Sequence, residues 1–250
     1  MLAAVIPAKN EEGRISRLLG NLLTLREIRE LAEIKVNILY FPEALGIDVP
    51  RAVGAAYAKK RGHKRFLFVD GDLTGDIREG LKELILNAEK NHLDMALTDC
   101  YPIPPQGNTL AREMLAFRQR LNEETRLFTA ISWSTPSHGP HLVSRRFLDM
   151  VPLRELAVPP AAMVHALKAR LSIGVAARIP HHFLGSSIKD LKHTQMVSET
   201  IIGDTLEALE LYRGEKRTRT HQGRVFLGYH PFRRLDLLES YLVSTGYMTD

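Results

Sequence analysis

Two carboxylates stand one residue apart at Asp70-Gly71-Asp72, directly after the apolar run 65–69. The run predicts a buried strand, and ligands of open α/β sheets bind beyond the carboxyl ends of the strands. A carboxylate pair at such an edge can hold Mg²⁺, which often binds one or two carboxylates together with water and substrate phosphates. Two aspartates at this spacing could also simply cap a turn. The prediction that they bind a metal and, through it, a diphosphate therefore depends on their position directly after a strand.

The rest of the chain supplies the elements that must position this pair. Apolar runs alternate with amphipathic stretches in the first half, which predicts βαβ units and an α/β fold with a mainly parallel sheet. Asn10 is the expected N-cap of the first helix, and Asp76-Ile-Arg-Glu79 has the form of a capping box. Strands are expected at 2–7, 35–41, 65–69, 93–98, 141–143 and 173–179, and helices at 49–61, 109–128, 160–171, 187–214 and 232–245.

Composition narrows the class of protein. The chain has 250 residues, 44% hydrophobic and 25% charged, which is ordinary for a globular protein. Its single cysteine, Cys100, fits a reducing compartment, and no signal peptide is evident, so we expect a cytoplasmic protein. A net charge of +5 suits an anionic ligand or the inner face of a membrane. No nucleic-acid motif is recognised.

Four segments that could carry chemistry occur in a fixed order. They are Ile6-Pro-Ala-Lys-Asn-Glu-Glu12, Leu45-Gly-Ile-Asp-Val-Pro-Arg-Ala-Val-Gly54, Phe68-Val-Asp-Gly-Asp72 and Ser137-His-Gly-Pro-His-Leu-Val-Ser-Arg-Arg146. In this order, over roughly residues 3–180, they resemble the family 2-type glycosyltransferases of the GT-A fold. The resemblance implies an enzyme that moves a sugar from a nucleoside-diphosphate sugar to an acceptor, with Mn²⁺ or Mg²⁺ on the diphosphate.

The resemblance also implies roles for single residues. Asp72 would be the direct metal ligand with Asp70 as its partner, and His138 and Gly139 would lie near the reacting centre. His182, which follows the last expected strand, would be a further metal ligand, with His181 and His193 as alternatives. The nucleotide-sugar pocket would be lined by Pro7, Ala8, Asn10, Glu11, Arg51, Asp70 and Gly71.

Two departures from the family pattern matter. Tyr40-Phe-Pro-Glu43 stands where the family commonly has an acidic turn after its second strand. The slot where inverting members keep an Asp general base is apolar here, Val158-Pro-Pro-Ala-Ala-Met163. Retaining transfer needs no dedicated protein base, so the sequence favours a retaining mechanism. His138 or His141 acting as base is the competing interpretation, since imidazole titrates near neutral pH.

Two other functions stay open from the sequence. A nucleotidyltransferase would share the sheet but needs a Gly-rich basic loop after the first strand, of which Gly13-Arg14 is a fragment. A non-catalytic nucleotide-sugar-binding homologue would explain the missing base. The basic segment Arg213–Arg224 is expected to order over an anionic partner, such as a phosphorylated or lipid-linked acceptor, or to be a solvated loop.

The expected organisation is a GT-A domain over 1–185 with a helical C-terminal extension over 186–250. Within the domain, 1–100 would form the nucleotide-sugar half and 101–185 the acceptor half. Peripheral membrane contact and a homodimer are both left open.

Overall fold

The computed structural model describes the whole chain apart from residue 12 and the ranges 24–35, 104–108, 187–189 and 248–250. A five-stranded sheet has the order β1-β2-β4-β3-β5. Four strands run in the same direction, and β4 is antiparallel to both of its neighbours. The strands are β1 (Leu2–Val5), β2 (Arg65–Phe68), β3 (Met95–Asp99), β4 (His141–Ser144) and β5 (Ile173–Arg178). This is a mixed, mostly parallel α/β sheet, as the sequence predicts.

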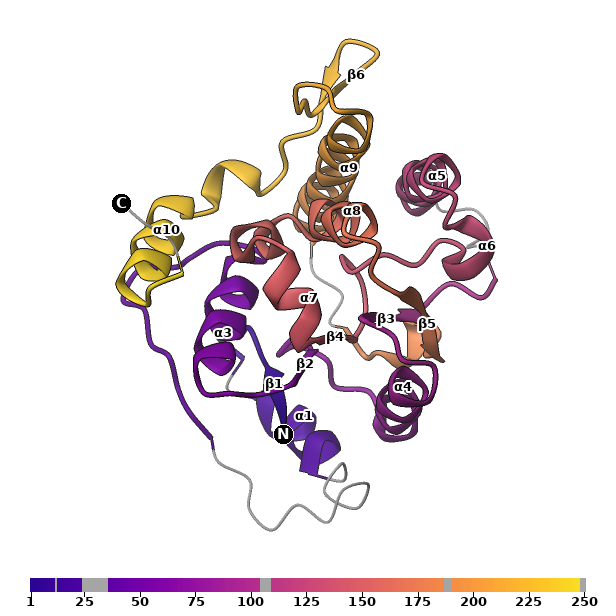
Figure 1. Cartoon of the computed structure of the whole chain (residues 1–250). Coiled ribbons are helices and arrows are strands. Elements are labelled where there is room, and N and C mark those ends of the chain that lie inside the picture. Colours follow the sequence, from indigo (N-terminus) through magenta and orange to yellow (C-terminus); the bar gives the residue numbers. More distant parts are fainter. Residues whose placement is uncertain (12, 24–35, 104–108, 187–189, 248–250) are drawn as a thin grey trace.

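Helices cover both faces of the sheet (Figure 1). One face carries α1 (Ile15–Leu23) and α4 (Arg78–Lys90). The other face carries α3 (Val49–Lys60), α7 (Arg145–Met150), α8 (Pro159–Lys168) and α9 (Leu191–Arg213). The sheet is buried from both sides because neighbouring side chains of a strand point to opposite faces. In β2, Phe66 and Phe68 belong to the core under α3, and Leu67 belongs to the core under α4.

The remaining elements surround this sandwich. Beside α9 pack α5 (Thr109–Glu124) and the hairpin of β6 (Thr220–His221) and β7 (Arg224–Val225), and α10 (Leu235–Ser244) returns to lie beside α3 (Figure 1). Short helices are α6 (Phe128–Ile131), η1 (Leu153–Ala157), η2 (His181–Phe183) and η3 (His230–Phe232). In the part of the chain that the structure describes, no helix combines the length and apolar character needed to cross a bilayer.

Helix α3 shows how closely the sequence prediction is met. It was expected over 49–61, and its alanines at 52, 55, 56 and 58 are all buried, as small side chains on a close-packed helix should be. A Cβ on Gly54 would collide with Val5 of β1, so a glycine is needed for this approach. The helix therefore lies close against the sheet next to the end of β1.

Other local predictions are wrong. Residues 36–41 form no strand, and Val36, Ile38 and Tyr40 are largely exposed; Lys35 lies outside the described residues. Asn10 caps no helix, because α1 begins only at Ile15 and Asn10 has a left-handed backbone with φ 57°.

The expected capping box at Asp76 does not form either. Its carboxylate accepts from the guanidinium of Arg78, and the N-cap of α4 is Ile77, without a side-chain cap. The expected helix 187–214 is α9, which begins at Leu191; residues 187–189 lie outside the described residues. The division of the chain at residue 185 stays a prediction.

Candidate functional site

Asp70, Gly71 and Asp72 follow β2 and form the loop at its carboxyl end. The backbone N–H of Gly71 donates to the carbonyl of Pro7 at 3.0 Å, and a Cβ on Gly71 would press against Pro7 and Ala8. The glycine is therefore what lets the carboxylate loop approach the exit of β1. The structure thus brings Pro7, Ala8 and Gly71, three of the predicted nucleotide residues, next to the carboxylate pair.

Arg51 fixes one of the two carboxylates. Its guanidinium donates to Asp70 at 2.7 Å, to the carbonyl of Pro136 at 3.0 Å, and lies 3.2 Å from Asp48. Burial alone would lower the pKa of Arg51, but the carboxylates of Asp70 and then Asp48 outweigh it and raise that pKa. Arg51 is therefore a permanent cation that orients Asp70 and ties the loop at Pro136 to it.

The ion pairs continue from Arg51 into the C-terminal part of the chain. Asp48 accepts from Arg233 at 3.0 Å, and Arg233 binds Asp204 of α9 at 2.6 Å. Asp204 in turn accepts from Arg219 at 2.7 Å. We call the series Asp70, Arg51, Asp48, Arg233, Asp204 and Arg219 the ion-pair chain. It joins the candidate metal site to α9 and the segment beyond it.

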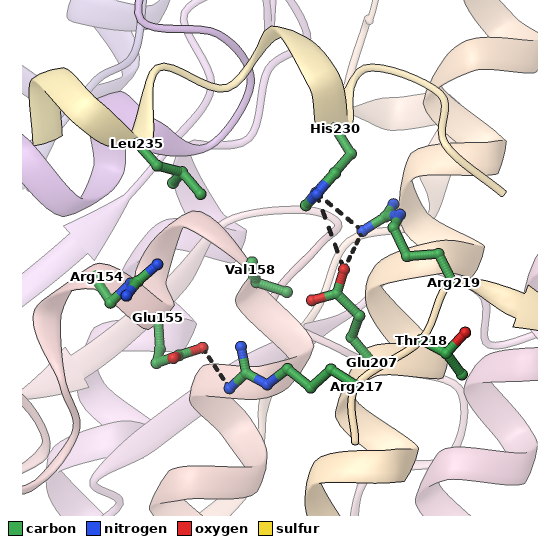
Figure 2. Close-up of a pocket in the computed structure, with 9 residues that line it drawn as sticks. All are labelled: Arg154, Glu155, Val158, Glu207, Arg217, Thr218, Arg219, His230 and Leu235. Carbon is green, nitrogen blue, oxygen red and sulfur yellow. Dashed lines mark hydrogen bonds and ion pairs between the residues drawn. The ribbon is translucent and has the colours of Figure 1, made fainter. Parts of the chain in front are cut away.

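The ion-pair chain ends at a pocket of about 330 Å³. Figure 2 shows that two of its arginines face carboxylates: Arg217 pairs with Glu155, and Arg219 pairs with Glu207 beside His230. Asp204, Glu207 and His230 bring ligand atoms within 4.8 Å of one another, which could suit a metal ion. Arg219 and Arg233 already donate to Asp204, however, so guanidinium groups take the place that a cation would need.

Carboxylates of the chain itself hold three arginines of the basic segment. Arg213 pairs with Glu124, Arg217 with Glu155 and Arg219 with Asp204. The segment is therefore ordered without an anionic partner, and binding of such a partner stays a prediction.

The loop beyond the carboxylates is held against the turn that follows β5. The N–H of Gly75 donates to the carbonyl of Leu184 at 3.0 Å, and the hydroxyl of Thr74 donates to that of Gly185 at 2.7 Å. A Cβ on Gly75 would collide with the carbonyl of Phe183. Through these contacts the turn that carries His181 and His182 lies beside the loop after Asp72.

Three aromatic rings stack next to this turn. The Nε2 of His138 lies 3.1 Å from the Nδ1 of His181, and the ring of Tyr101 stacks on both. Burial, and then the positive charge of Arg118, lowers the pKa of His138 well below its usual value and also lowers that of His181. Both rings are therefore neutral at pH 7, a state in which imidazole can bind a metal.

The other predicted histidines lie in different surroundings. His182 is exposed and packs on Phe183, whereas His193 hydrogen-bonds the hydroxyl of Tyr229 at 2.7 Å. His141 is buried against Phe68, and burial, followed by the charge of Arg51, lowers its pKa to about 3. Its burial makes it a poor partner for a substrate proton.

Two further predicted nucleotide residues lie between β1 and α1, and their place in a nucleotide pocket stays a prediction. Glu11 is paired with Arg14 at 2.9 Å, and Asn10 is exposed. Gly139, predicted near the reacting centre, has φ 75° and lies so close to Cys100 that a Cβ would strike its sulfur. Gly139 therefore serves the close packing of this loop against the end of β3.

The sequence prediction missed Arg118, Arg233 and Asp204. Arg118 lies on the buried face of α5, with Met114, Leu115 and Leu121 at helical spacing. A charged residue on an apolar stripe was the available signal. Asp204 likewise follows Ile201 and Ile202 in a buried part of α9, whereas nothing around Arg233 in the sequence distinguishes it from Arg234.

Comparison with known proteins finds solved structures that share the fold of this chain. Glucosyl-3-phosphoglycerate synthase from Mycobacterium tuberculosis, in complex with Mn²⁺, uridine diphosphate and phosphoglyceric acid, matches with a TM-score of 0.56 at 14% identity, covering 88% of this chain and 80% of that chain. The same enzyme with Mn²⁺, UDP-glucose and phosphoglyceric acid matches with a TM-score of 0.56 at 15% identity, over 88% and 82% of the two chains. No protein-family model and no curated protein sequence matches. The chain therefore has a GT-A-type fold.

Proposed function

We propose that this protein is a metal-dependent glycosyltransferase that uses a nucleoside-diphosphate sugar, with a UDP-sugar as the first donor to test. The observation that carries the proposal is the carboxylate pair at the end of β2, with Asp70 held by Arg51 at 2.7 Å and Gly71 seated against Pro7 and Ala8. The choice of UDP rests on the solved neighbour, which was crystallised with UDP-glucose.

The residues present fit a divalent cation. Asp70 and Asp72 offer carboxylate oxygens, the ligands that Mg²⁺ and Mn²⁺ take in proteins. The side chain of Asp70 is 38% exposed, so it can bind a ligand from solvent while Arg51 donates a hydrogen bond to its Oδ1. A bound cation would neutralise charge on the departing diphosphate. Of the histidines, His181 and His182 are carried closest to this loop by the contacts of Thr74 and Gly75.

We further propose that the transfer retains the anomeric configuration. The first turn of α8, Pro159–Met163, is fully buried and apolar. The nearest carboxylates are engaged elsewhere, because Glu155 binds Arg217 at 2.8 Å and Asp149 lies 3.1 Å from Lys59. None of these groups offers a free base for an acceptor hydroxyl. NMR of the product decides: an inverted anomer contradicts this part of the proposal.

Calorimetry with UDP, with and without Mn²⁺, tests the donor site. We expect Asp72→Asn to lose the metal-dependent binding and the thermal shift that accompanies it, while the ligand-free protein melts nearly unchanged. Asp76→Asn is the matched control, because Asp76 is an exposed carboxylate four residues further on that pairs with Arg78. Full binding by Asp72→Asn would refute the metal role of this residue.

The same samples separate the other functions. Binding of UDP without hydrolysis or transfer from any UDP-, GDP- or ADP-sugar indicates a non-catalytic binding protein. Preference for a triphosphate with release of pyrophosphate indicates a nucleotidyltransferase.

A further inference from the structure

Arg118 is a cation buried without a counter-ion. It belongs to α5, it is 1% exposed, and its Nε and Nη2 have no hydrogen-bond partner. Among the described residues, no ion pair to Arg118 is formed. A guanidinium taken out of water is costly unless acceptors or an opposite charge replace the lost hydration. The described part of the chain therefore leaves the surroundings of Arg118 without an opposite charge.

Further polar groups without partners lie on the loop 134–138, which passes beside this arginine. The hydroxyls of Ser134, Thr135 and Ser137 are buried and unpaired. Ser134 and Thr135 line a gap next to Arg118, together with Thr98, Cys100, Tyr101, Trp133 and His138. No Asp or Glu is among these lining residues. A guanidinium with hydroxyls and no carboxylate is a set of donors suited to an anion.

The neutral groups nearby do not remove this need. Asn122, one turn further along α5, has an unpaired side-chain oxygen that could accept one N–H of Arg118, but it brings no charge. Burial raises the pKa of the Cys100 thiol to about 12 and also raises the pKa of Tyr101, so both are uncharged at neutral pH. The positive charge of Arg118 thus stays uncompensated within the described part of the chain.

The position of the gap connects it to the candidate donor site. Pro136, between the unpaired hydroxyls of Thr135 and Ser137, accepts a hydrogen bond from Arg51, which holds Asp70. The loop 134–138 therefore touches the arginine of the metal site on one side and Arg118 on the other. The stacked rings of Tyr101 and His138 line the same gap, and His181 joins them from the turn beside Asp72.

The gap is closed in this conformation. It has no room for a water molecule, so neither solvent nor a ligand reaches the guanidinium while the rings stay stacked. Tyr101, Trp133 and His138 are the half-buried residues of the lining, and His181, which stacks on Tyr101, is exposed. These rings therefore form the side of the gap that is nearest to solvent. Displacement of the His138–Tyr101 stack would open the gap toward the side where the donor is proposed to bind.

We propose that Arg118, with the hydroxyls of Ser134 and Thr135, binds a carboxylate or phosphate group of the acceptor, and that the His138–Tyr101 stack moves aside to admit it. The acceptor role rests on the proposed glycosyltransferase function, but the anion site does not. Anion binding can therefore be measured without donor, metal or turnover.

The first test is calorimetry with inorganic phosphate and, separately, with acetate, in a zwitterionic buffer without nucleotide. We expect wild type and Arg120→Met to bind at least one of the two, and Arg118→Met to bind about tenfold more weakly or not at all. Arg120 is an exposed arginine of the same helix, so it controls for the loss of one charge. Tighter binding of phosphate indicates a phosphorylated acceptor, and tighter binding of acetate indicates a carboxylic acid.

A second measurement separates a binding role from a structural one. If Arg118 waits for an anion, Arg118→Met should melt at or above wild type in anion-free buffer, because an uncompensated charge is replaced by an apolar chain of similar length. Added anion should then raise the melting temperature of wild type and leave the variant unchanged.

Three results would overturn the anion site: wild type that binds neither anion, an Arg118→Met variant that binds both as wild type does, or a variant that melts well below wild type without anion. Failure of UDP and Mn²⁺ to bind wild type would instead refute the proposed function and leave the anion titration readable.

Discussion

Arg233 and Arg118 are both buried arginines, but their surroundings are opposite. The side chain of Arg233 is fully buried and touches two carboxylates, Asp48 at 3.0 Å and Asp204 at 2.6 Å. Arg118 touches none among the described residues. The charge of Arg233 is balanced by carboxylates of the folded chain, whereas the charge of Arg118 is balanced by no described residue. The difference teaches that burial of a charge does not by itself identify a site; the presence or absence of its counter-charge does.

The comparison has an energetic basis. Removing one partner of a buried ion pair leaves the other charge without solvent or counter-ion, which is strongly destabilising. Removing a charge that has no partner lifts a desolvation cost instead. The same substitution, arginine to methionine, should therefore have opposite effects on the free energy of unfolding in the two places.

The largest effect is expected at Arg233→Met. It leaves Asp48 without the cation that binds its second oxygen and removes one of the two cations on Asp204, so we expect a loss of about 3–5 kcal/mol in the free energy of unfolding. Urea denaturation measures it. Arg234→Met is the control, because the side chain of Arg234 is 36% exposed and pairs with Glu43 and Asp236 at the surface, where water and salt weaken an ion pair, so little loss is expected.

Arg233→Met also tests whether the ion-pair chain reaches the donor site. Asp48 shares Arg51 with Asp70, so hydrogen exchange of the ligand-free variant should quicken over 45–51 and 70–75. Unchanged exchange in these peptides would confine Arg233 to the stability of the C-terminal part.

The sequence predicted the sheet and the carboxylate pair because both are local. A buried apolar run followed by two aspartates can be read without knowing what packs nearby. It did not predict the ion-pair chain, since Arg51 and Asp48 are more than a hundred residues from Asp204 and Arg233, and the two groups meet only in three dimensions. The strand expected at 35–41 failed for a related reason: apolar residues favour a strand, but pairing with a neighbour forms it, and residues 36–41 pair with no strand in the described part of the chain.

The next prediction concerns the pH dependence of stability and His141, which lies near the paired arginine Arg51. His141 lies against Phe68 near Arg51, with its pKa lowered to about 3. As pH falls below about 6.5, the unfolded chain gains a proton at this residue before the folded chain does, so stability is lost on acidification from there toward pH 3. The slope for one proton is about 1.4 kcal/mol per pH unit. His141→Phe should remove that slope between pH 6 and 4, and parallel profiles for the two proteins would contradict it.

A smaller effect is expected where two loops meet. Gly75→Ala would push a Cβ into the carbonyl of Phe183, and we expect a loss of about 1–3 kcal/mol together with weaker Mn²⁺-dependent binding of UDP. Gly20→Ala is the control: a Cβ there meets nothing within 4 Å, and alanine favours a helix, so it should stabilise slightly. Loss of stability with unchanged Mn²⁺-dependent binding would show that the turn after β5 only supports the loop and does not position the metal site.

The smallest effect is expected at Arg217, which extends the comparison to a third arginine. Arg217 pairs with Glu155 at 2.8 Å, and its side chain is 32% exposed. The side chain of Glu155 is only 11% exposed, but it lines the pocket of about 330 Å³, so water in that pocket can solvate the carboxylate that the variant leaves behind. Arg217→Met should therefore cost about 1 kcal/mol or less in urea denaturation. The Arg217→Met variant should bind vesicles with anionic headgroups as well as wild type does, because the guanidinium of Arg217 is already paired with a carboxylate of the chain. A large loss of vesicle binding would show that the pair opens to bind an external anion. An arginine with a counter-charge in the folded chain could then still have a binding role when the pair is accessible to solvent.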